Sequence, residues 1–322
     1  MVDWGAGNYE RVAAELEPIA LAVAERASLR RGDKVIDLAC GTGNAALIAA
    51  SRGARVVGVD AAPRLLDVAR ERARASGAEV DFREGDLLDL PVADGAADVV
   101  LSVFGVIFAT DPAGALREVR RVVRSGGRVF LSAWVPAGPI DAMLATLGRI
   151  LRRVAQAQPP ERFPWSDGAA VDRLASEAGL TLESTVCAEL AIRDSSPEAY
   201  VAAGQEHPMA LAVRPALQAA GAEIEVQEAM TAVLREANED PDGFWCIVVT
   251  LSTSSRPPER PLRRLARRLV TRRCSEAWRS SGTLSPRARC DSPRGAPETT
   301  NGGGSDAALP QKSRSTGEGR VL

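Results

Sequence analysis

The stretch Val35-Ile36-Asp37-Leu38-Ala39-Cys40-Gly41-Thr42-Gly43-Asn44-Ala45-Ala46 decides the fold of this 322-residue chain. It begins with β-branched residues, which are typical of a buried parallel strand. Two glycines follow, and small residues then open a helix. Glycine lets the backbone approach a ligand closely, and the start of a helix presents N–H groups without partners inside the helix. The stretch therefore predicts a nucleotide-binding loop between a strand and a helix.

Carboxylates follow two further short apolar strands. Asp60 ends the strand 54–60 and lies seventeen residues past Gly43, close to the roughly 20 expected for an acid that binds ribose hydroxyls. Asp86 comes soon after the strand at 79–83, and Leu87 follows it directly. Because the carboxyl ends of parallel strands meet at one edge of a sheet, we expect these acids to converge with the glycine loop.

The residues around the glycines distinguish between two families of nucleotide-binding loop. Gly41-x-Gly43-x-x-Ala46 fits the looser dinucleotide fingerprint. With Asp37 and Ala39 in front, however, the order acid-x-small-x-Gly-x-Gly resembles motif I of class I S-adenosylmethionine-dependent methyltransferases. Segments 97–102 and 119–131 resemble later strands and a helix of that family, and residues 2–9 resemble its N-terminal segment, which folds over the cofactor. The resemblance is strong over about residues 1–135 and loose over about 136–252.

This resemblance implies S-adenosylmethionine as the cofactor and assigns roles to the residues quoted above. Asp60 is expected to hold the ribose, and Asp86 to lie beside the adenine amino group with Leu87 against the ring. The complete set of cofactor-binding residues that we predict is Asp37, Ala39, Cys40, Gly41, Gly43, Asp60, Ala61, Asp86, Leu87 and Ser102.

Alternation of strand and helix patterns up to about residue 131 predicts parallel βαβ units. We expect an α/β, Rossmann-like, doubly wound fold with a seven-stranded, mostly parallel sheet and an antiparallel last strand at 244–251. Gly126-Gly127 is expected to end the helix that Asp111-Pro112 begins. Helices at 197–237, between the sixth and seventh strands, are expected to form the substrate lid that this family often has. The methyltransferase domain would span residues 1–252.

The segment 253–322 differs from the rest in composition, with 15 Lys and Arg against 6 Asp and Glu. It is rich in Arg, Pro, Ser and Gly, which predicts a basic and mostly disordered tail. Residues 260–273 allow a short basic helix suited to an acidic membrane surface or to nucleic acid. A solvated tail without a partner is the simpler interpretation.

Composition limits the other classes of function. No apolar run approaches the roughly 20 residues needed to span a bilayer, and the N-terminus lacks a signal-peptide pattern, so we expect a cytoplasmic protein. The five cysteines are scattered without a C-x-x-C pair and the chain has one histidine, so neither a metal site nor a disulfide framework is expected. The acidic body predicts no nucleic-acid partner.

The predicted function is transfer of a methyl group from S-adenosylmethionine to a small-molecule acceptor. The resemblance favours a quinone-like or secondary-metabolite acceptor. The sequence leaves open the acceptor's identity, the atom methylated and the oligomeric state. His207 is the first candidate for a general base, and Tyr9, Tyr200 and Glu206 are alternatives. Trp4, Trp134 and Trp165 are candidates for the acceptor pocket.

Two alternatives remain at this stage. An NAD(P)-binding Rossmann oxidoreductase would share the glycine loop and the ribose acid. The chain lacks the Tyr-x-x-x-Lys pair of short-chain dehydrogenases, because its only tyrosines are Tyr9 and Tyr200 and its only lysines are Lys34 and Lys312. A non-catalytic protein that binds S-adenosylmethionine is the second alternative.

Overall fold

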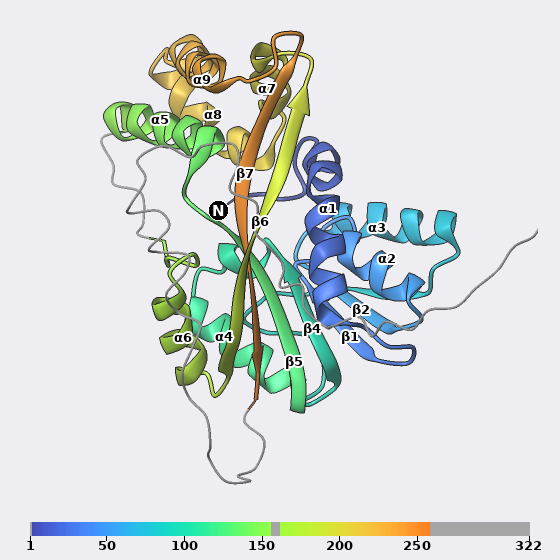
Figure 1. The fold of residues 1–322 in the computed structure, drawn as a ribbon. Coiled ribbons are helices and arrows are strands. Elements are labelled where there is room, and N and C mark those ends of the chain that lie inside the picture. Colours follow the sequence, from blue (N-terminus) through green and yellow to red (C-terminus); the bar gives the residue numbers. More distant parts are fainter. Residues whose placement is uncertain (1, 156–161, 258–322) are drawn as a thin grey trace, which may run out of the picture. The chain divides into compact units, whose positions relative to one another are not determined.

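A computed structural model describes residues 2–155 and 162–257 of the protein. A seven-stranded sheet runs through it in the order β3-β2-β1-β4-β5-β7-β6 (Figure 1). Its strands are β1 (Lys34–Leu38), β2 (Arg55–Asp60), β3 (Val80–Glu84), β4 (Ala97–Val103), β5 (Val123–Trp134), β6 (Thr181–Asp194) and β7 (Phe244–Arg256). Strands β1 to β5 pair in parallel, whereas β7 is antiparallel to both β5 and β6. The predicted Rossmann-like fold with its antiparallel last strand is confirmed.

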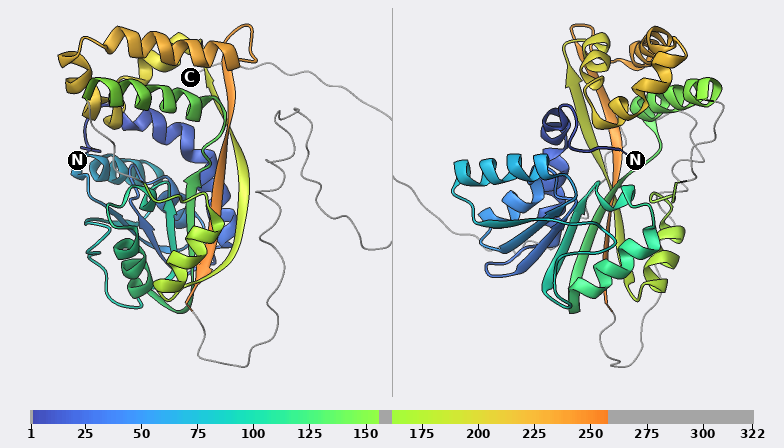
Figure 2. Two further views of the ribbon diagram at one scale, coloured as in Figure 1. Left: turned by 90° about the vertical axis from the view of Figure 1, so that its left-hand side faces the viewer. Right: turned by 180° about the vertical axis from the view of Figure 1, so that it is seen from behind.

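Helices cover both faces of the sheet (Figure 2). The helices of the sheet-covering layers are α1 (Tyr9–Ala27), α2 (Asn44–Ser51), α3 (Pro63–Ser76), α4 (Pro112–Val122) and α6 (Gly168–Glu177). Successive strand residues point to opposite faces, so Val99 of β4 belongs to the core beneath α1, α2 and α3, whereas Val100 belongs to the core beneath α4 and α6. This burial on both faces explains why the central strands are almost entirely apolar.

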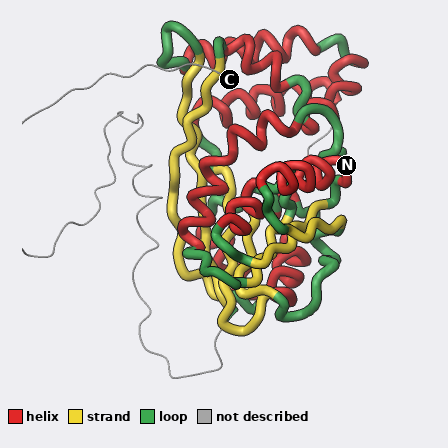
Figure 3. Tube along the Cα trace, turned by 90° about the vertical axis from the view of Figure 1, so that its right-hand side faces the viewer, coloured by secondary structure: helices red, strands yellow, loops and turns green. Residues whose placement is uncertain are grey.

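The remaining helices lie together at one end of the molecule, beside the ends of β6 and β7 that are joined to them (Figure 3). They are α5 (Gly138–Ala155), α7 (Pro197–Gly204), α8 (Pro208–Ala219) and α9 (Glu223–Ala237), and a single turn of 3-10 helix, η1 (Val106–Phe108), follows β4. Helices α7, α8 and α9 all fall between β6 and β7 in the sequence. They occupy the segment 197–237 in which the sequence predicted helices.

The helix boundaries follow local signals in the sequence. Pro63 is the first residue of α3, where its missing N–H costs no hydrogen bond, and Gly77 ends that helix with a φ of 66°. Asp111 caps α4, because its side chain accepts a hydrogen bond from Gly114 N at 2.9 Å. The start of α4 agrees with the prediction.

The prediction for Gly126-Gly127 was wrong. Helix α4 ends at Val122, and β5 begins at once with Val123. Ala97 pairs with Val123 and Val99 pairs with Arg128, so the register shifts between the two pairs, and Gly126 has a φ of 71°. A glycine pair suits an irregular strand as well as a helix end, since both need backbone torsions that other residues resist.

Strand β7 continues to Arg256, past the predicted end at residue 251. Residues 258–322 lie outside the described part of the chain, and the predicted basic tail lies almost wholly there. Within residues 2–155 and 162–257, no helix combines the length and hydropathy needed to cross a bilayer.

Candidate functional site

The glycine loop between β1 and α2 adopts backbone torsions that require small residues. The φ angles of Ala39, Gly41 and Gly43 are 49°, 54° and 86°. A Cβ on Gly43 would lie 3.2 Å from both Ala69 Cβ and Phe82 Cζ, so a side chain there would also crowd the neighbouring core. The loop is further held by Cys40, whose N–H donates to Val59 O of β2 at 3.0 Å. The local sequence thus fixes a tight loop at the carboxyl end of β1.

Asp60, at the end of β2, supports this loop with both carboxylate oxygens. Oδ2 accepts from Gly41 N at 2.7 Å, and Oδ1 accepts from Ala62 N at 2.8 Å. The side chain is buried, and burial raises the pKa of Asp60 even though these N–H groups favour its charged form. Each oxygen retains a lone pair that can accept a further hydrogen bond.

Asp37 is buried more deeply, near the end of β1. Its Oδ2 accepts from Ala46 N at 2.9 Å, in the first turn of α2. Burial raises the pKa of Asp37 to about 7, and the nearby Asp60 adds to this rise. A carboxyl group that titrates near neutrality and has no cationic partner among the described side chains is suited to a positively charged ligand group.

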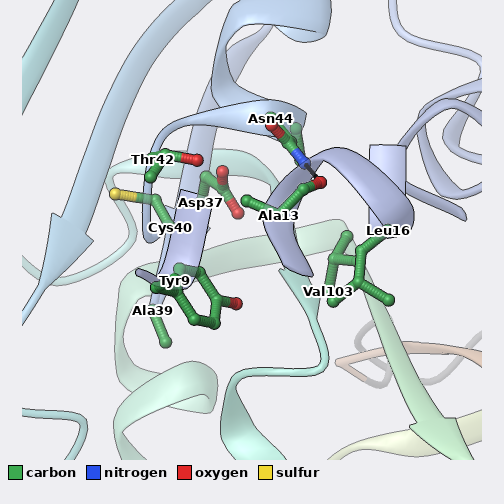
Figure 4. Close-up of a pocket in the computed structure, with 10 residues that line it drawn as sticks. Tyr9, Ala13, Leu16, Asp37, Ala39, Cys40, Thr42, Asn44 and Val103 are labelled. Atoms are coloured by element: carbon green, nitrogen blue, oxygen red, sulfur yellow. Dashed lines mark hydrogen bonds between the residues drawn. The ribbon is translucent and has the colours of Figure 1, made fainter. Parts of the chain in front are cut away.

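A cavity lies between α1 and the glycine loop, and Figure 4 shows its walls. It is lined by Tyr9, Ala13, Leu16, Asp37, Ala39, Cys40, Thr42, Asn44, Ala45 and Val103. The ring of Tyr9 lies against the loop, since a Cβ on Gly41 would be 3.2 Å from Tyr9 Cε1. Asp37, Ala39 and Cys40 were predicted cofactor-binding residues, and Tyr9 was considered only as an alternative general base and as the end of the segment expected to fold over the cofactor; the other lining residues were not predicted.

The cavity wall contains hydrogen-bond donors without partners. Burial, followed in order by the charges of Asp60, Asp37 and Cys40, raises the pKa of Tyr9 to about 12, so its hydroxyl keeps its proton. That hydroxyl makes no hydrogen bond to any residue that the structure describes. No side chain caps the N–H groups of Asn44 and Ala45 at the start of α2. The wall therefore combines an acidic group with donors that suit an anionic group.

Residues 2–8, here called the N-terminal arm, hold Tyr9 in this place. Arg64 of α3 donates to Gly5 O at 2.5 Å and forms an ion pair with Glu10 at 2.6 Å. At the other end of the arm, Asn8 N donates to Glu206 O at 2.9 Å, in the turn between α7 and α8. The arm therefore connects α3 with the α7–α8 turn and passes beside the glycine loop.

The loop after β3 is built differently. Asp86 is exposed, and its Oδ1 accepts only from Leu88 N, at 2.8 Å, within its own turn. Leu87 is half-buried and packs against the core beneath α4 and α6, and Ala61 after β2 is exposed. The structure thus places these three predicted residues at the carboxyl edge without joining them to the cavity wall.

Ser102 is a structural residue in this arrangement. Its buried hydroxyl donates to Leu38 O at 2.9 Å and accepts from Val106 N at 3.0 Å. These two bonds connect the end of β1 with η1, and they use the hydroxyl proton. Ser102 therefore shapes the loop after β4 and does not face the cavity.

His207 caps α8 with its ring. Nδ1 accepts from Met209 N at 3.1 Å, so the neutral ring carries its proton on Nε2. Burial lowers the pKa of His207, which favours this neutral form. While the cap is intact, neither ring nitrogen can take a proton, so this geometry does not supply the general base that the sequence analysis considered.

Aromatic residues gather near His207. Trp4 of the arm packs against Phe108 with ring centroids 4.6 Å apart, and its ring is 6.1 Å from that of His207. Phe104 stacks on Trp134 at 4.0 Å, where β4 and β5 end. Trp165 instead packs against Phe163, in the core beneath α4 and α6. Of the three tryptophans considered for an acceptor pocket, Trp165 is buried in this core, whereas Trp4 and Trp134 are partly exposed.

Comparisons with known proteins point to one family. Residues 36–131 match the methyltransferase domain family. The chain is 37% identical over 163 residues to the uncharacterized protein Rv1403c of Mycobacterium tuberculosis, covering 50% of this chain and 59% of that protein. It is 46% identical over 105 residues to the demethylmenaquinone methyltransferase of Thermus thermophilus, covering 32% of this chain and 48% of that enzyme. The chain therefore spans about half to three-fifths of the length of these relatives.

A solved structure supports the fold. The YcgJ protein of Bacillus subtilis superposes with a TM-score of 0.51 at 19% identity, covering 74% of this chain and 98% of that protein. At this identity the likeness concerns the arrangement of strands and helices alone.

Proposed function

Because residues 36–131 match the methyltransferase domain family, we propose that this protein transfers a methyl group from S-adenosylmethionine to a small-molecule acceptor. One observation carries the proposal: two buried carboxylates, Asp37 and Asp60, meet a glycine loop that leads into two helix N–H groups without partners in the described part of the chain, those of Asn44 and Ala45. A cationic amino-acid ligand with a ribose matches this set of charges. A nicotinamide cofactor has a pyrophosphate, which two buried carboxylates would repel.

Each group of the cofactor has a proposed partner among the residues present. Asp37 faces the cavity and would accept from the ammonium group, while the N–H groups of Asn44 and Ala45 would donate to the carboxylate. Asp60 would use its remaining lone pairs for the ribose hydroxyls, and Asp86 with Leu87 would hold the adenine. Main-chain contacts would come from Ala39, Cys40, Gly41, Gly43 and Ala61.

The cofactor, when bound, supplies an electrophilic methyl group on a sulfonium. The chain's own part is to hold the acceptor in line with that methyl group and to keep water away. Tyr9 and the N-terminal arm cover the glycine loop on the side where an acceptor would approach. Tyr9 stays neutral at physiological pH, so its ring covers the loop without adding a charge beside the two carboxylates.

A small-molecule acceptor is proposed on two grounds. The Thermus relative is named for demethylmenaquinone, a quinone and not a macromolecule. The described body is acidic overall, and such a charge repels the phosphates of nucleic acids.

Calorimetric titration of the full chain with S-adenosylhomocysteine and with NAD tests the cofactor. We expect S-adenosylhomocysteine to bind and NAD not to bind, and the reverse pattern would overturn the proposal. Incubation with methyl-labelled S-adenosylmethionine and fractions of a metabolite extract then tests catalysis. Transfer of label to a compound of low molecular mass is expected, and binding without transfer to any fraction would favour a non-catalytic protein.

A further inference from the structure

Arg72 of α3 makes hydrogen bonds to the glycine loop and to the first residue of α2. Its Nη1 donates to Thr42 O at 2.8 Å, to Thr42 Oγ1 at 3.0 Å and to Asn44 Oδ1 at 2.7 Å. Arg72 forms no ion pair with the residues that the structure describes. Its charge is therefore directed at three neutral oxygens, and hydrogen bonds from an ionised donor are stronger than those between neutral groups.

The bond to Asn44 also sets the orientation of that amide. Because Oδ1 accepts from Arg72, the amide nitrogen Nδ2 points the other way and donates to Ala13 O of α1 at 2.5 Å. Helix α1 also carries Tyr9, which lies against Gly41. Arg72 thus connects three elements, namely α3, the start of α2 and α1, through one amide.

Every residue that Arg72 holds lines the cavity, although Arg72 itself does not. Thr42, Asn44 and Ala13 are all wall residues. Asp60 fixes the other side of the loop through Gly41 N. The loop is therefore held from two sides, by a carboxylate beside the proposed ribose position and by a guanidinium beside the proposed amino-acid position.

We propose that Arg72 is a positioning residue that fixes the Thr42–Asn44 side of the cavity for the amino-acid end of the methyl donor. The inference rests on the proposed function, since it takes the cavity as the place of that end. Arg72 would then affect the binding of the amino-acid end only. The free N–H groups of Asn44 and Ala45 point toward that end only while Arg72 holds the loop in place.

Two ligands that differ in the amino-acid end test this role. S-adenosylhomocysteine has the amino-acid end, and 5′-methylthioadenosine lacks it but keeps the ribose and adenine. We expect Arg72→Met to weaken S-adenosylhomocysteine binding by about tenfold, as for the loss of a charged hydrogen bond, and to leave 5′-methylthioadenosine within about twofold. Arg74→Met is the matched control, because Arg74 is exposed on the same helix and should leave both affinities unchanged.

The melting temperature is measured for each variant, and Arg72→Lys is included because a lysine restores one charged donor. An intermediate affinity for S-adenosylhomocysteine in Arg72→Lys supports the proposal. Equal losses for both ligands, in step with a lower melting temperature, would overturn it and leave a purely structural role. Unchanged binding in Arg72→Met would also overturn it. If the unmodified protein bound neither ligand, the proposed function itself would fail.

Discussion

The two ends of the candidate cofactor site differ in how firmly they are held. At the glycine loop, Asp37 and Asp60 are buried and accept backbone hydrogen bonds from Gly41, Ala46 and Ala62. At the loop after β3, Asp86 is exposed and bonds only within its own turn. Both ends lie at the carboxyl edge of the same parallel sheet, so the position of a residue along the strands does not explain the difference.

The contrast indicates that carboxylates at one end of the candidate site stabilise the fold, whereas the carboxylate at the other end does not. Buried carboxylates that bond the backbone hold the loop in one conformation before a ligand arrives, so little ordering remains to be done on binding. Removing one of them leaves buried N–H groups unpaired, which destabilises the fold as well as the site. An exposed carboxylate neither holds the loop in one conformation nor pairs buried N–H groups. Its removal should therefore lower the affinity for the ligand without lowering the stability of the fold.

Asp60→Ala should lower the affinity for the cofactor product most, because it removes hydrogen bonds that hold the glycine loop. Gly41 N and Ala62 N would lose their partners, and we expect S-adenosylhomocysteine affinity to fall by about 1–3 kcal/mol. Calorimetry measures the affinity and thermal unfolding measures the accompanying loss of stability. Asp60→Asn keeps the shape of the side chain and one acceptor oxygen. Its affinity for S-adenosylhomocysteine should therefore lie between those of the unmodified protein and Asp60→Ala. A normal affinity in Asp60→Ala would show that the ribose acid is misassigned.

The pH dependence of binding should give the next largest effect. The pKa of Asp37 is raised to about 7 in the folded protein, so folding stability falls as pH rises from about 4 to about 7, because the unfolded chain releases this proton while the buried group still holds it. An ammonium group favours the charged carboxylate, so S-adenosylhomocysteine affinity should rise up to tenfold between pH 5.5 and 7.5, the change expected for about one pKa unit of coupling.

The control for this prediction is 5′-methylthioadenosine, which lacks the ammonium group and also reports any titration of Asp60. Asp37→Asn should remove the difference in pH dependence between the two ligands. If the two affinities changed in parallel with pH in the unmodified protein, Asp37 would not face the ammonium group.

Asp86→Ala should lower the affinity by less, and its effect should be confined to the loop after β3. We expect about a threefold to fivefold loss of S-adenosylhomocysteine affinity, as for one exposed hydrogen bond, with an unchanged melting temperature. A lowered melting temperature would mean that the two ends are not as different as the contacts indicate. Asp89→Ala in the same loop is the matched control.

Tyr9→Phe should give the smallest effect. The hydroxyl has no partner among the described residues and the ring contact with Gly41 is kept, so affinity for S-adenosylhomocysteine should stay within about twofold. A loss of tenfold or more, measured by the same titration, would show that the hydroxyl bonds the ligand and that the firmly held end extends into α1.

Much of the fold was predictable because its signals are local. The glycine loop, Asp60 and the caps of α3 and α4 each depend on residues within a few positions of one another. The misplaced start of β5 shows the limit, since Gly126-Gly127 suits a helix end and an irregular strand equally well. Tertiary pairing of Val123 with Ala97 decides between them.

The candidate site was predictable only in part. Its predicted residues remain predictions, but the wall formed by α1 was missed because it depends on contacts over long sequence separations. Asn44 donates to Ala13, thirty-one residues earlier, and no pattern within either segment announces that bond. His207 was considered as a base because it is the only histidine of the chain and falls in the expected lid. Histidine seldom caps a helix, so the sequence did not reveal that its ring is already engaged.

The N-terminal arm connects the α7–α8 turn with the cover of the glycine loop. A Cβ on Gly7 would lie 2.1 Å from Glu206 O, so the arm fits closely against the α7–α8 turn, and Tyr9 covers the glycine loop two residues later. Anything that moves this turn therefore moves the cover of the loop. By thermodynamic linkage, a compound bound beside α7 and α8 changes the donor's dissociation constant by the same factor as the donor changes its own. For the proposed function, we therefore expect the affinities of the methyl donor and of an acceptor bound there to be coupled through this turn.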